Sequence, residues 1–263
     1  MKFAGLFIAT ATPFDHAGSI YKVKIEHNVD KWNQTAVAGY AVCADAGEDT
    51  LLSADEKALV WELSAKWAAP QKILIAGASA DSVHETVALI ARAASLGYKA
   101  ALVRASRVEG ADSKLYFGAV ADRSELPVIA QADSADAVPP HPNIAAVRIS
   151  GATSKAVAVL GADAARLHAD LQAGAAGAIL SFANAAPYAC VTVWEAFRTR
   201  EQEAAEDWQK RIQPAVAAAR SISALKHAMD LNGYYGGPPR LPLVTPKPDE
   251  RALVEKAFDG IKS

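Results

Sequence analysis

The sequence predicts an α/β fold, a (β/α)8 barrel (TIM barrel) followed by a C-terminal helical extension. Short apolar runs alternate with longer amphipathic or alanine-rich segments, eight times in about 180 residues, which is the repeat of this barrel. The runs are continuously apolar rather than alternating, as is typical of strands buried on both faces of a parallel sheet. A doubly wound sheet is the alternative, but no glycine-rich phosphate-binding turn follows the first run.

The strands and helices of this repeat can be assigned in order along the chain. The expected strands lie at 5–11, 39–43, 72–77, 100–104, 127–131, 144–149, 156–161 and 177–182. Segment 53–68 opens with "SADE", a capping serine followed by acidic residues, and predicts a helix. Segments 81–96 and 162–173 predict helices that end at Gly97 and Gly174, because glycine commonly terminates a helix.

Two connections are too short for the complete pattern. About a dozen residues separate the fifth run from the sixth, and about six separate the sixth from the seventh. A parallel crossover with its helix usually needs about 10–12 residues. We therefore expect ring helices 5 and 6 to be shortened or missing, which leaves a thinner wall that another subunit can cover.

The chain is expected to form a single structural unit. Residues 1–185 supply the barrel, and residues 186–263 supply a helical extension that packs on it. Within the extension, "YYGGPPRLPLV" (234–244) predicts a rigid turn before a last helix at 248–260. No internal linker or low-complexity tract separates the two parts.

Composition restricts the partners. A formal net charge of −2 predicts neither nucleic acid nor an anionic membrane surface as partner, because both require a concentrated basic patch. Cys43 and Cys190 are too few for a disulfide framework or a zinc site, and the histidines are scattered, so no metal or cofactor is expected. The opening "MKFAGLFIATATPF" is interpreted as a first strand rather than a signal peptide. We expect a cytoplasmic protein that binds a small molecule.

Function in this fold is located at the carboxyl ends of the strands. The polar residues expected there are Thr10, Thr12, Asp45, Glu48, Ser79, Arg104, Arg107, Gln131, Asp133, Arg148, Ser150, Asp163, Ser181 and Asn184. One interpretation makes Asp45, Arg104 and Arg148 a salt-bridged plug. The other makes Arg148 and Arg104 bind an anionic small molecule, with Asp45 or Asp133 as the base. The sequence leaves both open.

Several segments resemble one family in sequence and in order. They are "GLFIATATPFDHAGSI" (5–20), "VCADAGEDTLLSADEK" (42–57), "ILIAGAS" (73–79), "LQAGAAGAILSFANAAP" (171–187) and "LNGYYGGPPRLPLVTPKPDER" (231–251). Together they resemble the dihydrodipicolinate synthase and N-acetylneuraminate lyase family, pyruvate-dependent aldolases on a (β/α)8 barrel. The resemblance implies a lyase that assembles as a homodimer or homotetramer.

The resemblance also implies a chemistry whose residues are replaced here. In the family, a lysine on the sixth strand forms a Schiff base with pyruvate and a tyrosine on the fifth strand shuttles protons; these positions are Arg148 and Gln131. The hydroxyl pair that holds the carboxylate corresponds to Asp45 and Ala46, and the arginine of the synthase branch corresponds to Asp136. A guanidinium stays protonated and cannot attack a carbonyl, and an amide is neither an acid nor a base.

The sequence therefore predicts a family member that is not a pyruvate aldolase. The positions equivalent to the family's catalytic residues are Arg148, Gln131 and Asp45, and the candidate substrate-binding residues are Arg104, Ala46, Asp133, Asp136 and Thr10. The first interpretation is an enzyme acting on, or binding, a small anionic oxo- or hydroxy-acid. The second is an inactive ligand-binding or structural relative. A third is a genuine synthase-type lyase with a relocated lysine, for which Lys155 and Lys226 are the candidates.

Overall fold

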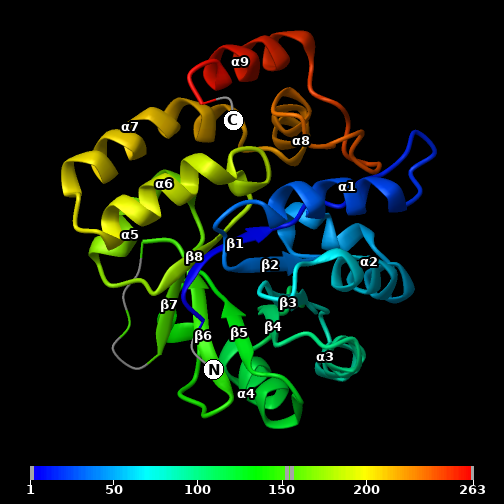
Figure 1. Ribbon diagram of the computed structural model, residues 1–263. Coiled ribbons are helices and arrows are strands. Elements are labelled where there is room, and N and C mark those ends of the chain that lie inside the picture. Colours follow the sequence, from blue (N-terminus) through cyan, green and yellow to red (C-terminus); the bar gives the residue numbers. More distant parts are fainter. Residues whose placement is uncertain (1–2, 152–153, 155–156, 262–263) are drawn as a thin grey trace.

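The computed structural model describes residues 3–151, 154 and 157–261, and these form a closed barrel of eight parallel strands (Figure 1). Each strand pairs with the next along the chain, and the first pairs with the last. The strands are β1 (Gly5–Ala9), β2 (Gly39–Val42), β3 (Ile73–Gly77), β4 (Ala100–Arg104), β5 (Val128–Gln131), β6 (Ile144–Ile149), β7 (Ala158–Gly161) and β8 (Gly177–Leu180). The predicted (β/α)8 barrel with C-terminal helices is confirmed.

The strands are buried as their continuous apolarity predicts. Every residue of β1, β2 and β8 is buried. A glycine at the end of β3 sets the spacing at the mouth of the barrel, because a Cβ on Gly77 would lie 2.0 Å from the carbonyl oxygen of Cys43. The loop that follows β2 can therefore lie directly against the end of β3, which brings its acidic residues to the mouth.

Ring helices cover most of the barrel. They are α1 (Lys22–Asn33), α2 (Ala54–Trp67), α3 (Val83–Ser95), α4 (Ser113–Arg123) and α5 (Leu167–Gln172). The helix predicted from "SADE" is confirmed as α2, in which Ser53 and Glu56 form a reciprocal capping box. The helix predicted over 81–96 is confirmed as α3, with Ser82 as its N-cap. The segment expected to form a helix over 162–173 divides into the 3-10 helix Ala164–Arg166 and α5.

The two short connections differ in how fully they are described. Residues 132–143, between β5 and β6, contain the 3-10 helix Ala135–Ala137. Residues 150–157, between β6 and β7, include 152, 153, 155 and 156, which lie outside the described residues. The shortening of both ring helices therefore stays a prediction.

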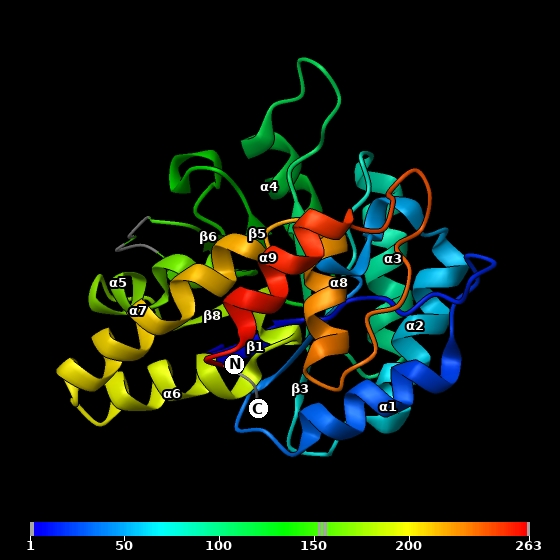
Figure 2. The same cartoon turned by 90° about the horizontal axis from the view of Figure 1, so that it is seen from above.

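In the described part of the chain, a 3-10 turn at Phe182–Asn184 and four α-helices follow β8: α6 (Pro187–Arg198), α7 (Gln202–Ala218), α8 (Ile222–Leu231) and α9 (Pro248–Phe258). Figure 2 shows α7, α8 and α9 gathered on one side of the barrel, where α7 packs against α6 and α9 packs against both α7 and α8. The segment after α8 is attached to α1, since the backbone N–H of Tyr235 donates to Asn28 Oδ1 at 2.7 Å. In the part of the chain that is described, no helix is long and apolar enough to cross a membrane.

Candidate functional site

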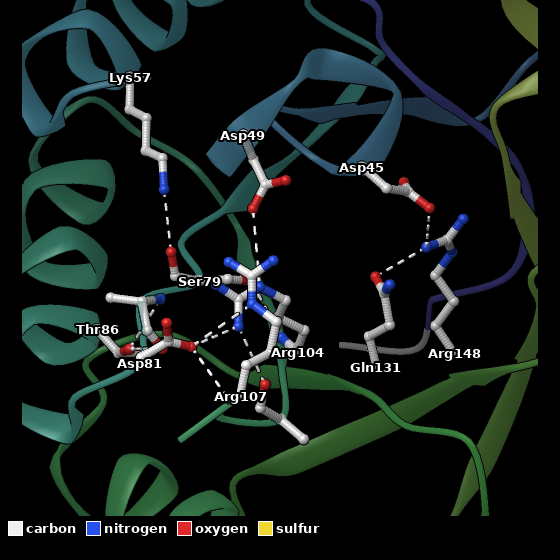
Figure 3. A network of polar contacts seen from close by, with 12 residues as sticks. Asp45, Asp49, Lys57, Ser79, Asp81, Thr86, Arg104, Arg107, Gln131 and Arg148 are labelled. Carbon is white, nitrogen blue, oxygen red and sulfur yellow. Dashed lines mark hydrogen bonds and ion pairs between the residues drawn. The ribbon is translucent and has the colours of Figure 1, made fainter. Parts of the chain in front are cut away.

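The loop after β2 carries the carboxylates of the barrel mouth. It consists of two 3-10 turns, Asp45–Gly47 and Asp49–Leu51, joined by Glu48 in a left-handed conformation with φ of 56°. Glu48 is held from the C-terminal segment, because its Oε1 lies 2.5 Å from Lys226 Nζ and its Oε2 accepts from the backbone N–H of Arg240 at 2.8 Å. This anchoring directs Asp45 toward β6 and Asp49 toward β4 (Figure 3).

Arg148 fills the centre of the barrel mouth. Its side chain is 2% exposed, and its Nη1 donates to Gln131 Oε1 at 2.8 Å and to Asp45 Oδ2 at 3.1 Å. Its Nε donates to the carbonyl oxygen of Ile179 at 3.1 Å. The strand register places Gln131 directly beside Arg148. The structure thus brings Arg148, Gln131 and Asp45 together, with Arg148 bonded to each of the other two.

A small cavity lies next to Asp45 and Gln131. It has a volume of about 20 Å³, which is room for about one water molecule. Its lining comprises Ala44, Asp45, Asp49, Gly77, Ser79, Leu102, Arg104 and Gln131. A buried arginine is tolerated only when charges and hydrogen bonds compensate it, which the Asp45 and Gln131 contacts provide. In this structure the centre is a charge-paired cluster.

Thr10 and Ala46, two of the candidate binding residues, are buried within the fold. Thr10 is buried and its Oγ1 donates to the carbonyl oxygen of Ala41 at 3.5 Å, and Ala46 is buried within the loop after β2. Asn184 is also buried, where it accepts from the backbone N–H of Ala11 and donates to the carbonyl oxygen of Ala9. These contacts fasten the chain after β1 and β8 and leave the roles of Thr10 and Ala46 as predictions.

The two aspartates after β5 lie elsewhere. Asp133 and Asp136 are both exposed on the connection between β5 and β6. Asp136 lines a groove of about 560 Å³ with Lys114, Pro139 and His141, and this groove shares no described lining residue with the central cavity. Their roles as ligand contacts also stay predictions.

A larger polar cavity lies beside this charge-paired cluster, at the ends of β3 and β4. It has a volume of about 430 Å³. Its lining comprises Asp49, Thr50, Leu52, Lys57, Ser79, Ala80, Asp81, Ser82, Glu85, Arg104, Arg107 and Val108. The wall carries three cationic side chains, Lys57, Arg104 and Arg107, together with three carboxylates, so the cavity suits a small polar molecule with a negative end.

Arg104 and Arg107 share one carboxylate in this cavity. Asp81 Oδ1 accepts from Arg104 Nη1 at 2.8 Å and from the backbone N–H of Arg107 at 3.0 Å (Figure 3). The hydrogen bond from Arg104 is the main cause that lowers the pKa of Asp81. The Nε–H of Arg104 is buried and donates to no acceptor among the described residues, and Asp49 Oδ2 lies 4.0 Å away. A buried donor without an acceptor is uncommon and marks a place where a ligand or water can bind.

Asp49 and Lys57 face the same cavity from the loop after β2 and from α2. Burial raises the pKa of Asp49, the nearby carboxylate of Asp45 adds to this, and the cationic Lys57, Arg104 and Arg107 oppose it. Lys57 is buried and its Nζ donates to the carbonyl oxygen of Ser79 at 3.0 Å. The cavity therefore holds an acid and an amine next to two guanidinium groups.

Sequence reasoning missed Asp49, Lys57 and Asp81. It considered strand ends, where it found Arg104 and Arg107, but Lys57 lies on a ring helix. A signal existed in the helical spacing, since Lys57, Trp61 and Ser64 recur at positions i, i+4 and i+7 and all three are buried. No cluster of three metal-ligating side chains occurs in the residues that the structure describes.

A closed eight-stranded parallel barrel with charged side chains at the carboxyl ends of its strands defines a (β/α)8-barrel protein whose site is at that face. The sequence matches the model of the Dihydrodipicolinate synthetase family over residues 2–132 and 143–260. The chain belongs to this family.

Known proteins are similar over almost the whole chain. A probable mitochondrial 4-hydroxy-2-oxoglutarate aldolase of Emericella nidulans is 27% identical over 288 residues, covering 97% of this chain and 93% of that protein. A 4-hydroxy-tetrahydrodipicolinate synthase of Gluconacetobacter diazotrophicus is 26% identical over 288 residues, covering 98% and 97%.

Solved structures share the fold at lower identity. A dihydrodipicolinate synthase of Bacillus anthracis superposes with a TM-score of 0.92 at 21% identity, covering 100% of both chains. An N-acetylneuraminate lyase of Aliivibrio salmonicida superposes with a TM-score of 0.87 at 22% identity, covering 100% of this chain and 98% of that one. These two likenesses establish the fold.

Proposed function

We propose that this family member has lost Schiff-base chemistry at the barrel centre and binds a small anionic oxo- or hydroxy-acid in the neighbouring cavity. The observation that carries the proposal is the buried Nε–H of Arg104, which finds no acceptor among the described residues at a cavity also lined by Arg107. A carboxylate between two guanidinium groups makes short, charge-assisted hydrogen bonds.

The contacts of Arg148 support the loss of the inherited chemistry. A guanidinium remains protonated at ordinary pH and cannot act as the attacking amine. Arg148 is also engaged with Asp45 and Gln131, and the cavity that these two residues line holds about 20 Å³. Of the lysines considered as replacements, Lys226 is paired with Glu48, and Lys155 lies outside the described residues.

The class of ligand is supported by the cavity and by the relatives' names. The cavity presents Arg104, Arg107 and Lys57 as cations, which suit a ligand with a negative charge. It also contains carboxylates, so a ligand that carries hydroxyl or carbonyl groups besides its charge fits this polar lining. The relative of Emericella nidulans is named for an oxo-diacid, 4-hydroxy-2-oxoglutarate. A small oxo- or hydroxy-acid matches both the charge and the volume of the cavity.

A thermal-shift panel tests the proposal. Pyruvate, 2-oxoglutarate, malate and phosphate are added separately, and at least one acid is expected to raise the Tm by several degrees. Saturation at 100 times Kd stabilises a protein by about 2.7 kcal/mol, and each kcal/mol raises the Tm of a chain of this size by about 2–4 °C. Arg104→Met should abolish the rise.

The matched control is Arg92→Met. Arg92 also pairs with an aspartate, Asp55, but on the surface of α2 and α3 and away from the cavity. Its variant should show the wild-type rise. If no member of the panel shifts the wild-type protein, ligand binding at this cavity is refuted.

An inactive structural relative is the second candidate, and the plugged centre favours it. A cluster of Arg148, Asp45 and Gln131 that only holds the strands together would leave every compound of the panel without effect. The panel therefore separates the two candidates.

The family and the composition support inferences about the oligomeric state, the compartment and the division of the chain. We infer a homodimer or homotetramer in the cytoplasm, with residues 1–185 as the barrel and 186–263 as the helical extension of one unit. Shortened ring helices 5 and 6 would leave the wall near β5 and β6 for another subunit to cover. Light scattering measures the molar mass in solution, which gives the number of subunits.

A further inference from the structure

We propose that Asp49 and Lys57 form a proton-transfer pair that exchanges the hydrogens on the carbon next to the carbonyl of a bound α-oxo acid, without a covalent intermediate. The inference rests on the proposed function, because it needs an oxo-acid in the cavity of Arg104 and Arg107. It adds an activity, enolisation, and assigns it to residues outside the plugged centre.

The placement of four side chains carries the inference. Asp49 comes from the loop after β2, Lys57 from α2, Arg104 from the end of β4 and Arg107 from the segment after it, and all four line one cavity of about 430 Å³. Figure 3 shows Lys57 reaching toward Ser79 and Asp49 facing Arg104, with Arg107 next to Arg104. A ligand whose carboxylate meets the arginines would place its carbonyl end toward Asp49 and Lys57.

Lys57 is suited to hold the carbonyl oxygen. An ammonium group has three N–H donors, and one of them donates to the carbonyl oxygen of Ser79. In the part of the chain that the structure describes, no carboxylate lies within ion-pair distance of Lys57 Nζ. A cation aimed at a developing enolate oxygen in a mostly buried site stabilises the transition state more than the ground state.

Asp49 is suited to be the base. Its side chain is 12% exposed, whereas Asp45 is 46% exposed and already paired with Arg148. Burial raises the pKa of Asp49, and a carboxylate with a raised pKa accepts a proton from carbon more readily. The charged groups that face it are Lys57, Arg104, Arg107 and Asp45.

The step balances without a co-reactant. Asp49 removes a proton from the carbon next to the carbonyl, the C–H electron pair becomes the C=C bond of an enolate, and the carbonyl electrons move onto the oxygen bound by Lys57. Asp49 then exchanges its proton with water and returns one to the carbon. The acid is regenerated, and in D2O its hydrogens are replaced by deuterium.

Proton NMR of pyruvate in D2O tests the inference. The methyl signal should decay faster with the wild-type protein than in buffer alone. Asp49→Asn should slow the catalysed exchange by about 100-fold or more, the usual contribution of a general base. Lys57→Met should also slow it, and Lys57→Arg should restore part of the rate because the cation returns.

The matched controls are two variants of residues on α2, the helix that carries Lys57. Asp55→Asn and Lys66→Met change exposed residues of α2 and should leave the exchange rate unchanged. Folding of each variant is checked by its far-UV circular dichroism and by its Tm without ligand. If Lys57→Met does not fold, Lys57→Arg and the Asp49 variant still decide the question.

The outcomes separate this inference from the proposed function. A rise in Tm with pyruvate but no exchange above buffer overturns the inference and leaves ligand binding intact. Exchange that survives in Asp49→Asn also overturns it. Exchange accompanied by a pyruvate adduct after borohydride reduction would mean a Schiff base and would replace the non-covalent mechanism. The absence of both the Tm rise and exchange refutes binding and enolisation together.

Discussion

The two partners at the barrel centre differ in exposure, since the side chain of Arg148 is 2% exposed and that of Asp45 is 46% exposed. Losing one partner therefore has different consequences on the two sides. Without Asp45 the guanidinium stays buried with neutral acceptors, whereas without Arg148 the carboxylate can turn to water. The burial of the group that remains sets the cost of breaking the pair.

This asymmetry predicts the order of two variants. Asp45→Ala should lower the free energy of unfolding by about 3 kcal/mol, because it leaves a buried charge uncompensated. Arg148→Met should lower it by about 1 kcal/mol, the cost of leaving the carbonyl oxygen of Ile179 without its donor. Urea denaturation of both variants measures the difference, and the reverse order would contradict the assignment of a plug.

The burial of Asp49 predicts a dependence of stability on pH. A carboxyl whose pKa is raised by folding binds its proton more tightly in the folded state, so the folded state loses stability as pH rises from the ordinary pKa through the raised one. Asp49→Asn should therefore be more stable than the wild type at neutral pH. The gain should disappear below about pH 4, near the unfolded pKa.

Unfolding curves between pH 3 and pH 8 check this prediction. Asp81 serves as the comparison, because its pKa is lowered, mainly by Arg104. Its contribution to stability is present above the ordinary pKa and is lost as the pH falls through the lowered one, the opposite sign. An Asp49→Asn gain that is equal at all pH values would count against a buried, ionised Asp49.

At the level of single residues, the sequence predicted the residues at the centre of the barrel mouth more completely than the residues that line the neighbouring cavity. The family resemblance grouped Arg148, Gln131 and Asp45, and the structure brings these three together. Arg104, which was expected in the same salt-bridged plug as Asp45 and Arg148, pairs with Asp81 instead. The sequence could not show how far each side chain reaches or which donor remains unpaired. Those properties depend on pairing in three dimensions, so Asp49 and Lys57 were missed.

Among the elements, the loop after β2 depends on a helix that is distant in sequence. Glu48 joins the two 3-10 turns, and it is paired with Lys226 of α8, with side chains 0% and 1% exposed. Burial lowers the pKa of Lys226, and the carboxylate of Glu48 opposes this. The position of Asp49 at the cavity thus depends on an ion pair with the C-terminal helices.

Breaking this pair should affect both stability and binding. Glu48→Gln leaves Lys226 buried without its counterion, and we expect the free energy of unfolding to fall by about 3–5 kcal/mol. The Tm rise caused by the oxo-acid should shrink, since the loop that carries Asp49 is released. The double variant Glu48→Gln, Lys226→Met should recover much of the stability. Failure to recover would mean that the pair is not the element that holds the loop.

The secondary elements were predictable where one physical cue dominated. Continuous apolar runs located the strands, and the serine cap of "SADE" located α2. The helix expected over 162–173 is shorter in the structure because Asp163 caps a 3-10 turn, by accepting from the backbone N–H of Ala165, before α5 begins. A local side-chain hydrogen bond of this kind competes with the helix and is not visible in the apolar pattern.

For the molecule as a whole, the paired Arg148 at the centre of the mouth predicts an unchanged mass. After incubation with pyruvate and reduction with borohydride, the intact chain should carry no adduct, because Arg148 cannot form an imine. Mass spectrometry of the whole protein samples every lysine at once, including Lys155. An adduct would be located by peptide mapping and would restore the interpretation of a relocated lysine.

The overall fold was predictable because a strand that is buried on both faces has a continuous run of apolar residues in the sequence. Whether side chains close the mouth of the barrel has no such pattern in the sequence. An arginine at the end of β6 is compatible with an open pocket or with a plug. The outcome depends on whether Gln131 and Asp45, both distant in sequence, lie within hydrogen-bond distance of it.

The ion pair between Glu48 and Lys226 also has a consequence for descent. Each of these buried charges is tolerable only in the presence of the other. A substitution of Lys226 alone would leave the buried carboxylate of Glu48 without a counterion and destabilise the barrel. A substitution of Glu48 alone would leave the cation of Lys226 buried and unneutralised. The two positions, 178 residues apart in the chain, are therefore expected to change together, so the C-terminal helices and the mouth of this barrel evolve as one inherited unit.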